Sequence, residues 1–228
     1  MDIIETALAD GQRALTEYQS KQLLAGYGIP VTREVLVKDA DAAVDGAAGI
    51  GFPVVLKGSS PELMHKSDAG CVKLGLATPE AVREAFDRIG KSAGKALDGV
   101  LVQEMVAGQR EIVIGLSRDA QFGPCVMLGT GGVLTEIIND TVFRVAPIDE
   151  IEAMDMIADL KSRAMLDAFR GQQPADLKAI CSVLAAVGRI GLEKAAISEI
   201  DINPLIITPE GRVVAVDALI ILDGKGSL

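Results

Sequence analysis

The polar residues that alternate with isoleucines near the C-terminal end of the chain are of types that bind a cation. A strand period of two puts Glu199, Asp201 and Asn203 on one face. A turn centred near Glu210 would bring Asn203 opposite Asp217, because the two lie equally far from the turn. Facing amide and carboxylate oxygens suit Mg²⁺, which takes oxygen ligands and keeps several waters. The alternative is the polar solvent face of an ordinary strand, although an acid within the apolar run around Asp217 needs a partner if buried.

Three further features have the composition of a phosphate site. Lys57 ends an apolar strand, so its ammonium could contact phosphate oxygens or simply extend into water. Gly131 and Gly132 belong to a Gly-Thr-Gly-Gly cluster that fits either a phosphate-binding turn or a tight connection between strands. The cluster matches neither the Walker pattern nor GxGxxG. Arg144, beyond it, suits a phosphate clamp or a surface salt bridge.

His65 is the single histidine of the chain, in a polar segment that reads Met-His-Lys-Ser-Asp. A lone histidine cannot build a metal site from several imidazoles. Most histidines in exposed loops take no part in chemistry. Neutral imidazole nevertheless attacks phosphorus readily, so His65 is either an inert loop residue or a nucleophile toward a phosphoryl group.

Composition limits the classes of function. The 228 residues carry 22 Lys plus Arg and 32 Asp plus Glu, a net charge of −10, which argues against nucleic-acid binding through a basic surface. Hydrophobic residues make up 49% and charged residues 24%, as in globular domains. No apolar run approaches the ~20 residues that cross a bilayer, so no membrane contact is expected. Three separated cysteines and an acidic N-terminus without a signal-peptide pattern lead us to expect a cytoplasmic protein.

The pattern of elements predicts an α+β fold of two lobes with a boundary near residues 106–110. Apolar runs predict strands over 52–57, 72–76, 99–106, 111–116, 124–128, 197–202 and 213–221. Capping signals predict helices after the box that begins at Thr16, from Pro79, after Asp149 and from Pro174.

These segments together resemble a known family. Residues 15–23 and 27–30 resemble the start of the succinyl-CoA synthetase β subunit, and residues 199–205 with 215–217 resemble its magnesium site. The chain is more similar still to the nucleotide-binding β subunit of ADP-forming acyl-CoA synthetases of the acetate–CoA ligase type. The matching motifs are Pro-Val-Val-Leu-Lys at 53–57, His-Lys-Ser-Asp at 65–68, Phe-Gly-Pro at 122–124 and Gly-Thr-Gly-Gly at 129–132. The resemblance extends from about Leu15 to Leu222, and the His-Lys-Ser-Asp motif is its most specific part.

The resemblance implies the ATP-grasp fold, whose two lobes close on a nucleotide. Residues 1–24 would form an N-terminal helix packed on the second lobe, 25–105 the first lobe, and 106–228 the second lobe with the magnesium site. It also implies roles for individual residues in binding ATP or ADP. Phosphate contacts would come from Lys57, Lys66, Gly131, Gly132 and Arg144, adenine contacts from Gln103, Glu104 and Met105, ribose contacts from Glu111, and magnesium ligation from Asn203 and Asp217.

The implied reaction is the reversible conversion of acyl-CoA, ADP and phosphate to acid, CoA and ATP. A histidine of a separate CoA-binding α subunit would take the phosphoryl group, and His65 would carry it on to ADP while Asp201 orients a phosphohistidine. We expect an α2β2 heterotetramer, because the chain lacks a CoA-binding segment of its own. Cys71 departs from the family, which more usually has Gly there and thereby a more permissive loop.

Two other functions remain open at this stage. Another ATP-grasp ligase would join a carboxylate to an amine through an acyl phosphate, and it would need no histidine carrier. A non-catalytic nucleotide-binding partner subunit is the second alternative. The intact Lys57, Asn203 and Asp217 argue against it.

Overall fold

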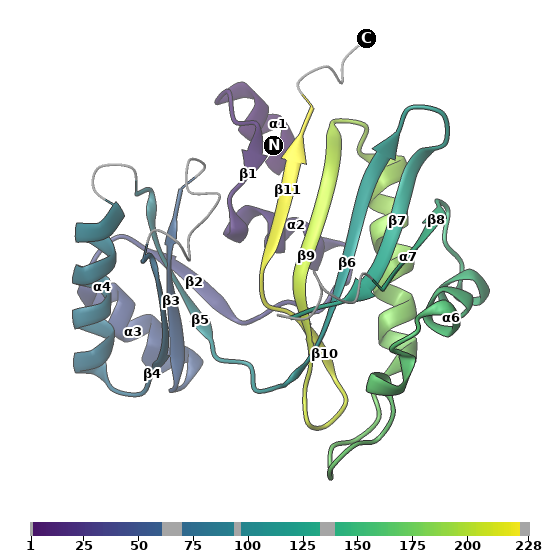
Figure 1. Cartoon of the computed structure of the whole chain (residues 1–228). Coiled ribbons are helices and arrows are strands. Elements are labelled where there is room, and N and C mark those ends of the chain that lie inside the picture. The colour runs from purple at the N-terminus through teal and green to yellow at the C-terminus, as the bar shows by residue number, and fades with distance from the viewer. Residues whose placement is uncertain (1, 61–69, 94–96, 133–139, 224–228) are drawn as a thin grey trace. The chain divides into compact units, whose positions relative to one another are not determined.

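The computed structural model divides the chain into two compact units (Figure 1). It describes all residues except 1, 61–69, 94–96, 133–139 and 224–228. Unit 1 comprises Met1–Val31 and Val106–Leu228, and unit 2 comprises Thr32–Met105. We expected the first lobe to start at residue 25, but the chain up to Val31 belongs to unit 1. The reason is pairing, since Ala215 donates its N–H to the Pro30 carbonyl at 2.8 Å and forms a parallel bridge with Val31.

Unit 2 is an antiparallel sheet with two helices. Its strands run in the order β2-β5-β3-β4, with bounds β2 Glu34–Val37, β5 Gly99–Glu104, β3 Val54–Ser59 and β4 Val72–Leu76. The helices are α3 Ala40–Ile50 and α4 Pro79–Ala93. Alternate residues of β3, Val54 and Leu56, pack with Val82 and Ile89 of α4 in one apolar core. The strand residues between them therefore project from the other face.

Unit 1 contains the larger sheet, in which antiparallel strands run in the order β1-β11-β9-β6-β7-β8. Their bounds are β1 Ala14–Leu15, β11 Ala218–Leu222, β9 Ile197–Ile207, β6 Arg110–Asp119, β7 Gly123–Thr130 and β8 Thr141–Val145. β10, Val213–Ala215, pairs with the far end of β9. Figure 1 shows these strands side by side, with α7 lying across the sheet.

Helices of unit 1 start at polar caps that the sequence contains. The bounds are α1 Ile3–Ala9, α2 Glu17–Gly26, α6 Glu150–Asp159, the 3-10 turn η2 Arg163–Leu166 and α7 Leu177–Glu193. The predicted capping box between Thr16 and Gln19 is confirmed, as is the Asp149 cap. The predicted start at Pro174 is wrong. α7 begins at Leu177 behind the cap Asp176, whose own N–H bonds to the Gly211 carbonyl at 2.8 Å.

One face of the unit 1 sheet forms the core. Ile114, Leu116, Val126, Ile200 and Ile202 are at most 2% exposed and pack with residues of α1, α2, α6 and α7. The residues that alternate with them point to the other face, where the candidate site lies. Within the described residues, none of the helices combines the length and apolarity that crossing a bilayer requires.

Candidate functional site

A bulge in β9 places Asn203 at the site. Ile112 of β6 pairs with Leu205 and Ile114 pairs with Ile202, so β9 uses one residue more than β6 over this interval. Asn203 and Pro204 are the two residues between the buried Ile202 and Leu205. A β-bulge of this kind bends a strand and redirects a side chain, and here Asn203 is exposed.

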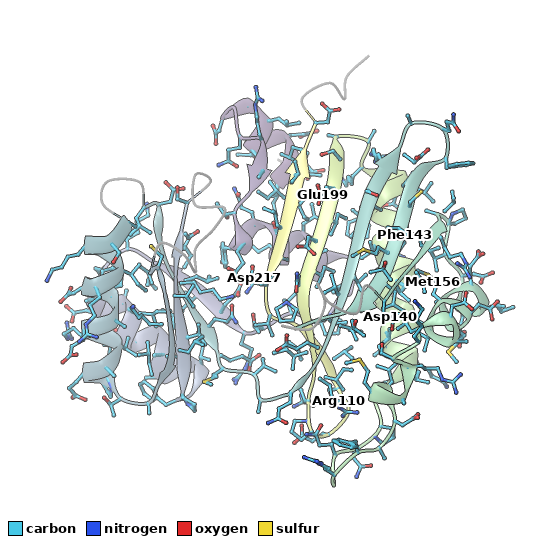
Figure 2. The ribbon with its side chains drawn as sticks, viewed as in Figure 1. Arg110, Asp140, Phe143, Met156, Glu199 and Asp217 are labelled. Carbon is cyan, nitrogen blue, oxygen red and sulfur yellow. The ribbon has the colours of Figure 1, made fainter. Side chains whose placement is uncertain are left out.

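Asp217 lies directly across from this bulge, at the two-residue corner between β10 and β11. The N–H of Asn203 donates to the Asp217 carbonyl at 3.2 Å, and the N–H of Val216 donates to the Pro204 carbonyl at 3.0 Å. The register predicted from the turn near Glu210 is therefore confirmed. Figure 2 labels Asp217 at this corner and Glu199 farther along the strand pair.

The carboxylate of Asp201 lies within electrostatic range of Glu199 and Asp217. Burial, together with the nearby charges of Glu199 and Asp217, raises the pKa of Asp201, while a hydrogen bond from the Asn203 side chain partly opposes that shift. The predicted alternation is confirmed, since Glu199 and Asn203 are exposed and Asp201 is half-buried between buried isoleucines.

A methionine covers the space next to Asp201, which sequence reasoning missed. Asp201 pairs with Gly115, and Gly115 pairs with Met127. A Cβ on Gly115 would lie 3.3 Å from Met127 Cε and 3.0 Å from the Ile200 carbonyl. The glycine therefore leaves room that the methionine side chain partly fills. No local signal could have revealed this contact, because it depends on the pairing of three strands.

The donor set fits Mg²⁺ completed by water and a phosphorylated ligand. Within the described residues, His, Cys, Asp and Glu side chains form no group of three or more that could hold a metal ion by themselves. The Asn203 amide oxygen and the Asp217 carboxylate supply oxygen ligands, and Asp201 adds negative charge nearby. Mg²⁺ commonly binds through one or two such ligands and fills its remaining positions with water and phosphate oxygens.

Close backbone packing joins Gly131 and Gly132 to Glu111. The N–H of Gly131 donates to the Glu111 carbonyl at 2.7 Å. A Cβ on Gly131 would lie 2.9 Å from Glu111 Cβ, so only glycine fits without displacement. Gly132 has φ +86°, and a Cβ there would lie 3.4 Å from Glu111 Oε2. The predicted ribose and phosphate residues of unit 1 are thus neighbours.

Arg110 holds the strand end that carries Glu111, a role that sequence reasoning did not assign. Arg110 is 7% exposed, and its guanidinium donates to the carbonyls of Asp167 at 3.1 Å, Gln173 at 2.7 Å and Thr208 at 3.4 Å. Figure 2 labels Arg110 close to the β9–β10 turn. These bonds tie three segments to the start of β6 and fix the backbone next to Glu111.

Lys57 and Gln103 share one face of the unit 2 sheet. Val55 pairs with Gln103, and directly paired residues point to the same side. Lys57 lies two residues from Val55 and therefore projects from that same face, away from Val54 and Leu56 in the core. Lys57 is 5% exposed and Gln103 is fully buried, so both are ordered side chains rather than solvated ones.

The predicted adenine segment ends unit 2. Glu104 accepts hydrogen bonds from the Arg33 N–H at 2.8 Å and from Arg33 Nε at 2.9 Å. Its carboxylate is therefore occupied by Arg33, and its own N–H donates to the Arg33 carbonyl at 2.9 Å. Met105, the last residue of unit 2, is 46% exposed.

Arg144 and Asp201 lie on opposite faces of the unit 1 sheet. Arg144 pairs with the fully buried Val126, so its side chain lies on the helix-covered face of the sheet. Asp201 projects from the other face. The Arg144 guanidinium contacts Asp159 Oδ2 at 2.6 Å. Arg144 therefore forms the surface salt bridge that was the alternative to a phosphate contact, and we do not include it in the proposed nucleotide site. His65 and Lys66 lie outside the described residues.

Comparison with known proteins identifies the family. The model of the ATP-grasp domain family matches residues 6–222. The β subunit of acetate–CoA ligase [ADP-forming] II from Pyrococcus furiosus is 41% identical, and the match covers 98% of this chain and 98% of that protein. A structure of the dinucleotide forming acetyl-coenzyme A synthetase 1 from Ca. Korarchaeum cryptofilum, with coenzyme A, Ca-AMPCP and HgCl+, superposes with a TM-score of 0.93 at 44% identity, over 97% of this chain and 99% of that one.

A second structure of the same Korarchaeum protein holds coenzyme A and Mg-AMPPCP, with its phosphohistidine segment pointing towards the nucleotide binding site. It superposes with a TM-score of 0.87 at 44% identity, over 97% of this chain and 99% of that one. The chain belongs to the ATP-grasp family and, within it, to the β subunits of ADP-forming acetate–CoA ligases.

Proposed function

We propose that this chain transfers a phosphoryl group between ATP or ADP and a histidine, as the β subunit of an ADP-forming acyl-CoA synthetase. The observation that carries the proposal is the opposed pair Asn203 and Asp217, set beside Asp201 at a strand bulge. Such a pair suits a magnesium ion bound together with phosphates. The Mg-AMPPCP complex of the Korarchaeum relative supports the same ligand class.

Each proposed binding residue contributes a distinct interaction with the nucleotide. The Lys57 and Lys66 ammonium groups offset charge on phosphate oxygens. Gly131, whose N–H donates to the Glu111 carbonyl, would hold the turn close to β6, and the Gly132 peptide would approach phosphate oxygens. Glu111 would accept a hydrogen bond from a ribose hydroxyl. Residues Gln103, Glu104 and Met105 would contact the base.

Magnesium, held by Asn203 and Asp217, would neutralise charge on the phosphates during transfer. An imidazole nitrogen of His65 forms a bond to the terminal phosphorus of ATP as the bond to the ADP oxygen breaks, which yields phosphohistidine and ADP. The reverse step returns the group to ADP. Asp201 would orient the phosphohistidine through its carboxylate.

The remaining chemistry belongs to a partner. We propose a CoA-binding α subunit that forms acyl phosphate and exchanges the phosphoryl group with His65, in an α2β2 assembly. The named relatives support this division, since the Pyrococcus protein is called subunit beta. The purified chain alone should then bind nucleotide but make no acyl-CoA from acid, CoA and ATP.

Labelling with γ-³²P ATP tests the proposal. Incubated with its α partner and Mg²⁺, the chain should acquire acid-labile, base-stable label, and His65→Ala should abolish that label and the overall turnover while leaving nucleotide affinity largely intact. His65→Asn should be equally inactive, because an amide cannot carry the group. Wild-type protein without label, together with near-normal turnover in His65→Ala, would contradict the carrier role. Turnover with an amine in place of CoA would favour the carboxylate–amine ligase instead.

A further inference from the structure

A buried ion pair on α2 adjoins the proposed metal-binding corner. Glu17 Oε1 and Lys21 Nζ lie 2.8 Å apart, one helical turn from each other, and each side chain is 1% exposed. Lys21 is among the largest fully buried side chains of the chain. Taking two charges out of water is costly, and the mutual attraction offsets that cost only with further hydrogen bonds. A pair buried this deeply is therefore expected to make further hydrogen bonds to its surroundings.

Lys21 also bonds to the residue before Asp217. Lys21 Nζ donates to the Val216 carbonyl at 3.3 Å, across 195 positions of sequence. Because the Val216 carbonyl belongs to the peptide that joins Val216 to Asp217, Lys21 restrains the peptide on one side of Asp217. The N–H of Asn203 restrains the Asp217 carbonyl, which belongs to the peptide on its other side.

We infer that Glu17 and Lys21 are positioning residues that set the direction of the Asp217 side chain. With both flanking peptides held, the Cα–Cβ bond of Asp217 has a fixed direction. The capping box at Thr16 and the packing of α2 against β11 hold the helix that carries the pair. The inference rests on the proposed role of Asp217 as a metal ligand.

The pair acts through geometry rather than through net charge. Glu17 neutralises Lys21, so the pair adds little field at the carboxylates of Glu199 and Asp201. The charge-assisted bond to Val216 is the part that matters for Asp217, since a charged donor binds a carbonyl more strongly than a neutral one does. Residues that orient a metal ligand typically change metal affinity about 10- to 100-fold when replaced.

The test replaces both partners at once. Lys21→Met alone would remove the cation that faces the buried Glu17 carboxylate, and such a loss can prevent folding. The double variant Glu17→Met/Lys21→Met removes both charges and the bond to Val216. It puts apolar side chains of similar volume in their place. Lys21→Arg keeps the charge and a donor. Lys194→Met serves as the matched control, because it removes a half-exposed pair with Asp2 in the same unit.

Two quantities are measured on the full-length chain, the calorimetric Kd of ADP with Mg²⁺ and the same Kd with EDTA. The double variant should raise the Kd with Mg²⁺ about tenfold or more and leave the Kd with EDTA within about twofold. Lys21→Arg should recover most of the difference, and Lys194→Met should match wild type in both conditions. Scanning calorimetry without ligand establishes that each variant is folded.

Asp217→Asn separates this inference from the proposed function. If Asp217→Asn weakens Mg²⁺–ADP binding but the folded double variant does not, positioning by Glu17 and Lys21 is overturned while the metal site stands. If Asp217→Asn leaves the affinity unchanged, the metal site is wrong and the inference is overturned with it. Equal losses with and without Mg²⁺ in the double variant would indicate a general distortion and would also overturn it.

Discussion

Asn203 and Asp217 face each other where the bulge of β9 meets the two-residue corner between β10 and β11, joined by the bond from the Asn203 N–H to the Asp217 carbonyl at 3.2 Å. Neither segment belongs to the regular ladder, because Ile202 and Ala218 are the last regular pair before them. The side chains of regular strand residues alternate strictly between faces, whereas a bulge frees two side chains to serve one ligand. Regular pairing of β9 with β10 and β11 thus flanks Asn203 and Asp217, which lie outside the ladder at the point where a metal would bind.

Asp217→Asn should weaken Mg²⁺–ADP binding at least about tenfold, because it removes the charged ligand of a divalent ion. Binding of ADP in EDTA should change little. Calorimetry measures both affinities, and Asp155→Asn on the exposed face of α6 supplies the same chemical change away from the site. Unchanged affinity and turnover in Asp217→Asn would exclude it as a ligand.

Gly131→Ala should destabilise unit 1 by about 1–3 kcal/mol, because the new methyl group would overlap the Glu111 backbone. The displacement should also lower nucleotide affinity, since Gly131 and Glu111 belong to the same proposed site. Urea unfolding and nucleotide titration measure the two effects. Gly49→Ala in α3 is the control, as nothing lies within 4 Å of its added carbon. If the two variants behave alike, close packing at Gly131 has no consequence.

Asp140 joins the start of β8 to the end of α6 (Figure 2). Its carboxylate accepts hydrogen bonds from the N–H groups of Lys161 at 3.0 Å and Ser162 at 2.8 Å, and from the Ser162 hydroxyl. Burial alone would raise the pKa of Asp140, but the bonds from Ser162 and Lys161 outweigh it and hold that pKa below its ordinary value.

A lowered pKa in the folded state gives stability that is present above the unfolded-state pKa of about 4 and is lost as pH falls toward the folded value. Asp140→Asn should therefore cost about 2–3 kcal/mol at pH 7. Its free energy of unfolding should also fall less than that of wild type below about pH 4. Urea unfolding across this pH range measures both. Parallel pH profiles for the two proteins would show that the Asp140 charge contributes nothing.

Local sequence patterns determined several elements and one part of the site. The alternation around Asp201 and the turn near Glu210 predicted that Asn203 and Asp217 face each other, because a short hairpin leaves little choice of register. The caps at Thr16 and Asp149 were equally predictable, since an N-cap bond joins residues only three apart.

Tertiary structure decided the rest. The face on which Arg144 lies depends on its pairing with Val126, and the start of α7 depends on a bond between Asp176 and Gly211. The contact of Lys21 with Val216 joins residues 195 positions apart. Sequence periodicity reports which residues share a face within one element, but contacts between elements depend on packing. The bulge at Asn203, the close approach of Gly131 to Glu111 and the support for Asp217 therefore emerge only from the folded chain.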